Sequence, residues 1–529
     1  MVYSLVAQQR TYKMTRNLRL GTRQSLLAMA QSRGVVQLIE CAHPKINVQL
    51  VGIETRGDRE LDVPLSAIEG KEFFVAELDR ALLNGDVDLT VHSMKDLSLE
   101  RPRELMLAAI PPRENPRDVV LFSPDIVSRL ESGAPIRIGT SSPRRVENLA
   151  PFLSQALPFL GHTPDIVTNA IRGNVDSRVG FLSLADDDVR KVDGVVLALA
   201  GLIRLWADTD GRAGLSRLLP GLRWMLLPLE EFPTAPGQAA LAIECRADDP
   251  ETRDLLAGLH CSLSAGQVDA ERRLLAEQGG GCHQRFGATS VSVHELGDLL
   301  FIRGTMANGE FISECHWSRS GQDVPAPLWD GTRWRGDAFM SRHATDIAVP
   351  DWLHRPGAMF IAHSRAMPES WLPVLRDHVG QRIWTSGTKS WFRLARRGLW
   401  VEGCAEQFGF AALQPTLEQG VLGLPAFGDW QILSHGDAAD AWPDHDVTVT
   451  YAVDPVEPLH AGHEAVRALR DAKSAFWTSG SQFNAFRQWI PDGCHHACRY
   501  GRTFYYLRQQ GLTHLTAWPS ISDWRKQGA

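Results

Sequence analysis

The sequence predicts an α/β protein made of several domains. From residue 18 onward, short apolar runs alternate with segments of helical periodicity, which is typical of βαβ units around a mainly parallel sheet. The chain has 529 residues, enough for three or four domains with separate cores. Its composition, 44% hydrophobic and 22% charged, is that of an ordinary globular protein.

The first two lobes are predicted from runs that follow one another along the chain. The first lobe should contain strands at residues 18–21, 47–53 and 87–91 and helices at 25–40 and 73–84. The second lobe should contain strands at 119–122, 136–139 and 194–199 and helices that begin near Ser142 and Asn174. The apolar run 240–245 would then return to the first sheet, so that two crossings create a hinged cleft.

A third segment begins with a predicted helix at residues 268–278 and continues with strands at 289–293 and 299–303. The stretch 318–356 is rich in Gly, Pro, Trp and Asp and is the best linker candidate. We expect these parts: a first lobe at 18–112 plus 226–247, a second lobe at 113–225, a third domain at 248–348, a linker at 349–357 and a C-terminal domain at 358–529.

Charge and cysteine usage narrow the function classes. The net charge of −7 argues against nucleic acid or an anionic membrane as the main partner, so an acidic ligand must meet local arginines. There is no signal-peptide pattern and no membrane-length apolar run, which predicts a cytoplasmic protein. Eight scattered cysteines suit a reducing compartment. Residues 494–498, Cys-His-His-Ala-Cys, lack a second cysteine pair, so helix-start residues are favoured over zinc and no metal is expected.

The segment Val-His-Ser-Met-Lys-Asp at residues 91–96 carries the strongest chemical signal. It continues the predicted strand 87–91, and ligands bind at the carboxyl ends of strands in open α/β sheets. Lys95 and Asp96 are therefore aimed at a cleft. The alternative is a surface turn that carries an ion pair.

Four further strand or loop ends carry arginines after Gly or Ser turns. Guanidinium groups bind carboxylates bidentately, and nearby hydroxyl groups add donors for the same anions. This pattern favours a polyanionic organic ligand that also carries a cationic or N–H group, although solvated surface arginines would explain any one block. The candidates are Arg23, Ser25, Ser142, Arg144, Arg145, Arg172, Arg178 and Arg204.

Cys282 follows three glycines directly after the third-domain helix. A single cysteine is most often a buried structural residue. An accessible thiol on an unobstructed loop can instead anchor a covalent group.

Together these blocks resemble the porphobilinogen deaminase (hydroxymethylbilane synthase) family over roughly residues 18–303. The resemblance implies three α/β domains, of which the first two are like a periplasmic binding protein and the third carries a cofactor cysteine on a loop. The motifs lie at residues 22–25, 55–58, 91–96, 139–145, 172–174 and 280–282.

The resemblance also implies the chemistry of the site. A dipyrromethane cofactor would be joined to Cys282 by a thioether, and four porphobilinogen units would be added head to tail with loss of ammonia. Asp96 matches the catalytic aspartate, and the arginines named above match those that bind acetate and propionate groups. Lys95 is expected to act in catalysis beside Asp96 and to contact the cofactor. Ser25 and Ser142 match further cofactor contacts, and Lys71 and Phe74 lie on a mobile loop.

Some positions depart from the family pattern and bear on the rate and on the geometry of the cofactor loop. They are Leu26, Glu72, Ala76, Ala239 and Arg285.

The C-terminal part, about residues 358–523, is weakly similar to uroporphyrinogen-III synthase, a family with two α/β lobes. This similarity implies a domain that cyclises the linear product to uroporphyrinogen III. Its candidate residues are Thr385, Ser386, Tyr451, Thr478 and Ser479. They either take part in chemistry or cap helices.

The alternative for the whole chain is a non-catalytic module that binds a tetrapyrrole or another anion, because the cleft fold also serves binding alone. We expect a monomer, although the sequence leaves the oligomeric state open.

Overall fold

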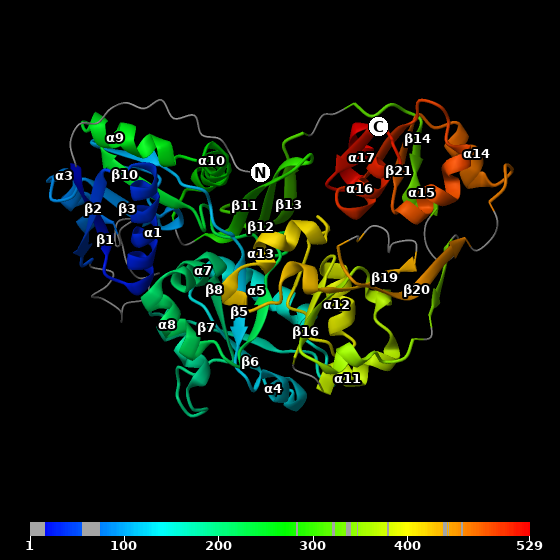
Figure 1. The fold of residues 1–529 in the computed structure, drawn as a ribbon, viewed down its shortest axis with the longest axis horizontal. Coiled ribbons are helices and arrows are strands. Elements are labelled where there is room, and N and C mark those ends of the chain that lie inside the picture. The colour runs from blue at the N-terminus through cyan, green and yellow to red at the C-terminus, as the bar shows by residue number, and fades with distance from the viewer. Residues whose placement is uncertain are drawn as a thin grey trace.

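A computed structural model describes residues 16–55, 75–281, 284–319, 323–334, 340–345, 347–377, 380–436, 442, 444–455 and 459–528. The described strands form five sheets, each covered by helices or by a neighbouring part (Figure 1). In Figure 1 the first lobe is blue apart from its green returning strand and helix at residues 241–256. The second lobe is cyan to teal, the third domain is green, and the C-terminal part is yellow to red apart from its green first strands.

The first lobe is a five-stranded sheet in the order β2-β1-β3-β10-β4. β1 is parallel to β2 and β3, whereas β10 runs antiparallel between β3 and β4. Its strands are β1 (Arg16–Arg23), β2 (Ile46–Ile53), β3 (Leu89–Ser93), β4 (Leu105–Ala109) and β10 (Leu241–Arg246). Its helices are α1 (Leu26–Ala42), α3 (Ala76–Leu83) and α9 (Pro250–Leu256). The predicted return of residues 240–245 to the first sheet is confirmed by β10.

The second lobe is a five-stranded sheet in the order β7-β6-β8-β5-β9. Strand β5 lies between β8 and β9 and is buried along its whole length, as the apolar run at residues 119–122 requires. The strands are β5 (Asp118–Phe122), β6 (Ile136–Gly139), β7 (Ile166–Asn169), β8 (Gly194–Ala198) and β9 (Arg223–Leu226). The helices are α4 (Ile126–Ser132), α5 (Pro143–Ala156), α6 (Val175–Gly180), α7 (Leu199–Ala207) and α8 (Thr209–Leu218).

The third domain packs helix α10 (Ser262–Glu277) on an antiparallel three-stranded sheet. Its strands are β11 (Arg285–Val293), β12 (Gly297–Thr305) and β13 (Phe311–Trp317). The predicted α/β class is thereby confirmed for all three parts of the N-terminal half.

The C-terminal part has two sheets of its own. The six-stranded sheet contains β15 (Met340–Ala344), β20 (Val447–Pro455), β19 (Gln431–His435), β16 (Gly357–Ile361), β17 (Gln381–Thr385) and β18 (Gly403–Cys404), in that order. The four-stranded sheet contains β14 (Leu328–Asp330), β21 (Ser474–Trp477), β22 (His495–Arg499) and β23 (Leu515–Trp518). The helices are α11 (Leu372–Asp377), α12 (Thr388–Ala395), α13 (Gln414–Leu417), α14 (Glu464–Arg470), α15 (Gly480–Phe486), α16 (Arg502–Gln509) and α17 (Ile521–Gln527).

The strand pairing corrects the predicted third-domain boundary and linker. β14 pairs with β21, and β15 pairs with β20. Residues 328–330 and 340–344, which the prediction placed in the third domain, therefore belong to the C-terminal sheets. Within the predicted linker 349–357, Leu353 is fully buried in an apolar core. A strand of three residues is too short to show a period, which explains why this segment looked irregular.

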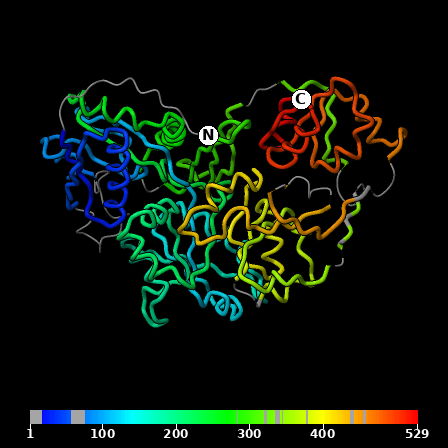
Figure 2. The backbone as a smooth tube through the Cα atoms, viewed as in Figure 1, coloured from blue at the N-terminus to red at the C-terminus, as the bar shows by residue number. Residues whose placement is uncertain are grey.

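The second lobe and the six-stranded sheet share their apolar cores. The Trp391 ring meets Phe152 edge-on at 5.4 Å, and its indole N–H donates to the carbonyl of Ala156 at 3.0 Å. The backbone N–H of Leu226, at the end of β9, donates to the backbone carbonyl of Glu402 at 2.7 Å. Figure 2 shows the yellow segment near residue 400 beside the cyan and teal trace of the second lobe. The two parts therefore form one packed unit.

Glu406 fastens this unit to the two crossings between the first and second lobes. Its buried carboxylate accepts from the guanidinium of Arg117, just after the first crossing, and from the backbone N–H of Leu229, at the start of the second. The C-terminal part thus contacts both crossings directly.

Among the described residues, every helix is too short or too polar to cross a bilayer.

We expect Trp391→Ala to lower the free energy of unfolding by about 3–5 kcal/mol, because it empties a fully buried site. Hydrogen exchange should show β5 and β16 losing protection together, since their cores are shared. The half-buried Trp489 offers a matched control, and Trp489→Ala should cost less. Loss of protection confined to the six-stranded sheet would contradict a shared core.

Candidate functional site

Asp96 lies on a short, well-anchored turn at the carboxyl end of β3. The last strand residues lead into a single 3₁₀ turn, Met94–Asp96, in which Met94 is buried and Asp96 is exposed. The backbone N–H of Met94 donates to the carbonyl of Ala240 at 3.0 Å. The turn therefore holds a solvent-facing carboxylate in a fixed position.

Arg272, on helix α10 of the third domain, also holds this turn, and the sequence analysis missed it. Its guanidinium donates to the carbonyls of Met94, Leu97 and Ser98 at 3.2, 3.0 and 2.9 Å. An arginine inside an otherwise regular helix gave no distinguishing signal, because its partners are backbone carbonyls about 175 residues away.

The glycine loop that leads to Cys282 lies against the same turn. Gly279, Gly280 and Gly281 have φ values of 85°, 70° and 91°, a left-handed conformation that strongly favours glycine. A Cβ atom on Gly280 would lie 3.0 Å from the Leu99 side chain. The loop thus lies next to Leu99, which follows Asp96 by three residues in the sequence. Cys282 itself lies outside the described residues, as do Lys71 and Phe74 of the predicted mobile loop.

Lys95 points toward the second crossing rather than toward Asp96. Its Nζ atom donates to Oε1 of Gln238 at 3.2 Å, and the Gln238 amide donates to Asp118 at 2.8 Å. Burial lowers the pKa of Lys95, and the carboxylates of Asp96 and Asp118 partly offset this effect. The alternative interpretation, a surface turn in which Lys95 pairs with Asp96, is therefore wrong.

Asp118 is a central residue of the site that the sequence analysis did not identify. It begins the buried strand β5, and its carboxylate accepts from Arg144 and Arg145 at 2.7 Å each. Burial alone would raise the pKa of Asp118, but the two guanidinium groups hold it well below its usual range. The only sequence signal was a charged residue directly before an apolar run.

Arg144 and Arg145 are therefore buried and already engaged. Arg144 also donates to the carbonyl of Pro233 at 2.9 Å, and Arg145 donates to that of Val196 at 2.8 Å. Direct contact of these two guanidiniums with a cofactor carboxylate stays a prediction. Their partners here are protein groups.

Arg178 and Arg204 have no carboxylate partner among the described residues. Arg178 donates to Gly173 at 2.8 Å, and Arg204 donates to Ala239 at 2.5 Å. Burial lowers the pKa of each to about 10, and for Arg178 the nearby guanidiniums of Arg145 and Arg172 add to the effect. Glu114 partly offsets the effect of burial on the pKa of Arg204. Buried guanidinium groups without a paired carboxylate form an environment suited to an anion.

The remaining predicted contacts lie at strand and helix ends of the two lobes. Arg23 ends β1 and is half-buried, and Arg172 is half-buried just before α6. Ser25 caps α1 by accepting from Ala28 at 3.4 Å. Ser142 precedes α5, but its hydroxyl makes no capping bond.

The departures from the family pattern have visible local consequences. Leu26 and Ala76 simply begin helices α1 and α3. Ala239 takes a φ of 72°, where glycine is unstrained. Arg285 pairs with Glu147 of α5 at 3.0 Å and so joins the third domain to the second lobe. Glu72 lies outside the described residues.

In the C-terminal part, four candidate hydroxyls lie at the two Thr-Ser-Gly turns. Thr385 ends β17 and Ser386 follows it, while Thr478 and Ser479 follow β21, in a different sheet. Ser479 accepts from the backbone N–H of Gln482 at 3.1 Å and caps α15, as the helix-cap interpretation predicts. It also lines a cavity of about 110 Å³ with His435.

Tyr451 is buried and lies beside this cavity. Its ring contacts the ring of His435 at 5.4 Å.

Residues 494–498 enter strand β22, so the expected helix start is wrong. His496 instead accepts from the indole N–H of Trp477 at 3.0 Å.

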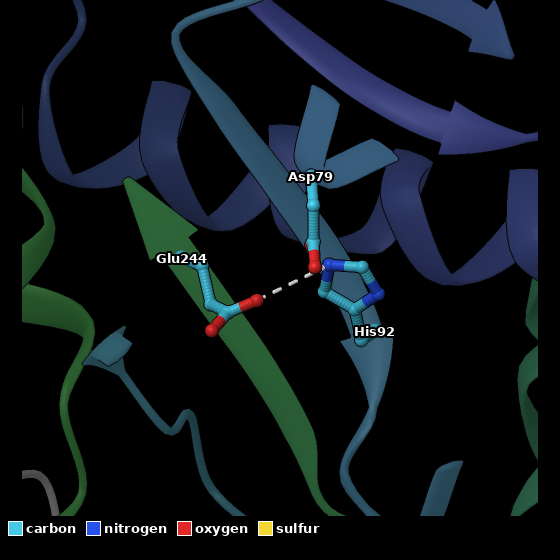
Figure 3. A group of neighbouring side chains, drawn as sticks. All are labelled: Asp79, His92 and Glu244. Atoms are coloured by element: carbon cyan, nitrogen blue, oxygen red, sulfur yellow. Dashed lines mark ion pairs between the residues drawn. The ribbon is translucent and has the colours of Figure 1, made fainter. Parts of the chain in front are cut away.

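A cluster of Asp79, His92 and Glu244 lies in the first lobe, with His92 in the strand β3 that leads to the Asp96 turn. Its donor atoms are close enough to suggest a metal (Figure 3). Arg101 already supplies the positive charge, because its guanidinium donates to both carboxylates at 2.6 to 2.9 Å. His92 Nε2 lies 3.4 Å from Glu244. The cluster is thus a satisfied ionic core that braces β3.

We expect acid to weaken the fold through His92. Burial lowers its pKa from 6.5 to about 4, so the unfolded chain binds a proton that the folded chain rejects. The stabilisation is fully present above pH 6.5 and is lost as the pH falls to about 4. It amounts to on the order of 3 kcal/mol.

Chemical denaturation of His92→Gln across this pH range checks the expectation. The variant should show a shallower dependence of stability on pH. The exposed His162 provides the control, because His162→Gln should keep the original slope. Equal slopes for wild type and His92→Gln would disprove the role of His92.

Solved structures similar to part of the chain include the effector binding domain of BenM with its effector benzoate. That domain has a TM-score of 0.24 and 15% identity, with 51% of this chain and 96% of that chain covered. The sulfonate-binding protein SsuA of Methylobacillus flagellatus KT has a TM-score of 0.26 and 10% identity, covering 51% and 74%. Scores this low support no inference.

Sequence comparisons identify the N-terminal half. The family model for the dipyrromethane cofactor binding domain of porphobilinogen deaminase matches residues 18–254. Porphobilinogen deaminase of Syntrophotalea carbinolica is 39% identical over 299 residues, covering 56% of this chain and 85% of that protein. Porphobilinogen deaminase 1 of Streptomyces avermitilis is 41% identical over 302 residues, covering 56% and 81%. The chain therefore belongs to the porphobilinogen deaminase family.

Proposed function

We propose that this transferase joins four porphobilinogen units head to tail, releasing one ammonia per unit, on a dipyrromethane primer attached to Cys282. The observation that carries the proposal is the surplus of guanidinium groups around the second crossing. Arg178 and Arg204 lack carboxylate partners among the described residues, while Arg144 and Arg145 share the single carboxylate of Asp118. A ligand with acetate and propionate groups would supply the missing negative charge.

The residues present fit the cofactor that the family uses. Arg178 and Arg204 would hold its carboxylates, together with Arg23 and Arg172. Arg144 and Arg145 share one carboxylate, that of Asp118, so the three groups together carry one positive charge. Lys95, Ser25 and Ser142 are proposed as further contacts. Bound dipyrromethane supplies the growing end to which each substrate unit is joined.

Asp96 would provide the charge and the proton acceptor that the reaction needs. Its carboxylate is exposed on a turn held by Met94 and Arg272. A fixed carboxylate stabilises the positive charge that develops as ammonia leaves and can accept a proton from the reacting carbon. Lys71 and Phe74 are proposed to cover the site during this step.

Replacing Asp96 by Asn tests this role while keeping the size of the side chain. We expect porphobilinogen consumption to fall about a hundredfold or more. Intact-protein mass should still exceed the sequence mass by the covalent dipyrromethane, which separates lost chemistry from lost assembly.

The control for this experiment is Cys282→Ser, which should have the plain sequence mass and no turnover. A wild-type chain without extra mass would favour the non-catalytic binding module. Full activity in Asp96→Asn would remove the catalytic role of the aspartate.

A second proposal assigns cyclisation of the linear product to the C-terminal part. The chain contributes β14 to the four-stranded sheet, then forms the six-stranded sheet, and returns at β21. This path makes two α/β lobes joined by two crossings, as the similarity to uroporphyrinogen-III synthase implies. Ser479 lines the small cavity, and Tyr451 contacts the ring of His435, which also lines it; these two are the candidate residues of this activity.

The isomer of the product tests the second proposal. Full-length protein given porphobilinogen should release uroporphyrinogen III, and Tyr451→Phe should shift the product toward the spontaneously formed type I ring. Chromatography of the oxidised porphyrins separates the two isomers. Porphobilinogen consumption should stay unchanged in this variant, and a type I product from the full-length wild type would contradict the proposal.

A further inference from the structure

A cavity of about 540 Å³ lies between the third domain and the four-stranded sheet of the C-terminal part. The N-terminal half supplies one wall, which includes Glu230, Phe301 and Ser313. The opposite wall includes Arg499 and Ser520, which lie at or just after the carboxyl ends of parallel strands β22 and β23. Ligands bind at such strand ends, and this volume is typical of ligand pockets.

Direct contacts hold the two walls together. The rings of Trp317 in β13 and Trp518 in β23 lie 4.9 Å apart, and Arg508 of α16 pairs with Glu295. Glu406, which also lines the cavity, is bonded to the hinge as described above. The cavity is therefore formed before any ligand arrives and belongs to both halves.

Most acidic groups of the lining already have partners. Glu314 pairs with His316 at 2.9 Å, and Asp523 accepts from the hydroxyl of Ser520 at 2.6 Å. Glu230 has no hydrogen bond or ion pair within the described part of the chain, although it is accessible from the cavity. Loss of bulk water around its carboxyl raises the pKa of Glu230, and Arg499 partly offsets this effect.

The cations of the lining lie on the C-terminal wall. Lys526 is exposed in the cavity, and no carboxylate of the described residues pairs with it. Arg499 donates to the carbonyl of Pro519 at 3.1 Å and contacts Gln407, which fixes its guanidinium at the rim of β22. Anionic groups of a ligand would meet positive charge on this side only.

Flat apolar surfaces complete the lining. Phe301 comes from the N-terminal half, while Tyr500 and Trp518 come from the C-terminal half. All three are less than 9% exposed, so they are fixed parts of the wall and present only a small part of each ring to the cavity. The apolar part of the wall is therefore rigid and would contact the edges or small areas of a ligand ring.

We infer that this cavity binds a carboxylated oligopyrrole and that both halves of the chain build the site. Ligand carboxylates would meet Lys526 and Arg499, pyrrole N–H groups would donate to Glu230, and the pyrrole rings would lie against the apolar part of the wall. The inference rests on the proposed function, because the deaminase half would release such a molecule. It adds a binding site apart from both the Asp96 turn and the small cavity that Ser479 lines.

Calorimetric titration of the full-length chain with uroporphyrin I, a stable ring with eight carboxylates, tests the inference. Lys526→Glu should weaken one class of sites by about tenfold or more, because it reverses the charge that meets the carboxylates. Ser313→Trp should abolish the same class by filling the cavity from the opposite half. The exposed Lys473 lies outside the lining, so Lys473→Glu is the matched control and should bind as the wild type does.

Porphobilinogen consumption is measured on the same preparations and should be unchanged in all three variants. Isotherms of Lys526→Glu and Ser313→Trp that superimpose on the wild type would overturn the inference, since any binding would then occur elsewhere. A wild type that consumes no porphobilinogen but binds in a Lys526-dependent manner would refute the deaminase function and leave the cavity site standing.

Discussion

The site depends on one buried carboxylate, Asp118, which stands against two buried guanidiniums. Its bonds to Arg144 and Arg145 fix the start of α5, and its bond from Gln238 fixes the second crossing and, through it, Lys95. One negative charge cannot balance this many cations, so the pocket is stable but remains positive. Breaking a buried pair of this kind costs about 3–5 kcal/mol, which makes the carboxylate structural as well as electrostatic.

Local structure was predictable where short-range signals determine it. The strand at 136–139 coincides with β6, and the Thr-Ser-Gly turns open helices as expected. The partners of Asp118 were not predictable, because the arginines that pair with it lie more than 25 residues away and ion pairing leaves no periodic pattern. β14 was missed because three residues show no period. Residues 494–498 were misjudged because the Pro-Asp-Gly turn before them starts a strand as readily as a helix.

The C-terminal part is more than an appended module. It shares cores with the second lobe, and through Glu406 it contacts both crossings about which the two lobes would hinge. Any closing motion of the first lobe must therefore occur against a second lobe that is already braced. The C-terminal sheets are thereby joined to the lobes that hold Asp96 by packed cores and hydrogen bonds rather than by a flexible linker alone.

The shared core also has a consequence for biosynthesis. The second lobe is complete once β9 has been made, but Trp391 and Glu402, which cover its edge and apolar face, follow more than 160 residues later in the sequence. At translation rates of 5–20 residues per second, that interval is on the order of ten to thirty seconds. During this time the nascent chain presents an unfinished apolar face and an open sheet edge, which are the features that chaperones recognise and that lead to aggregation.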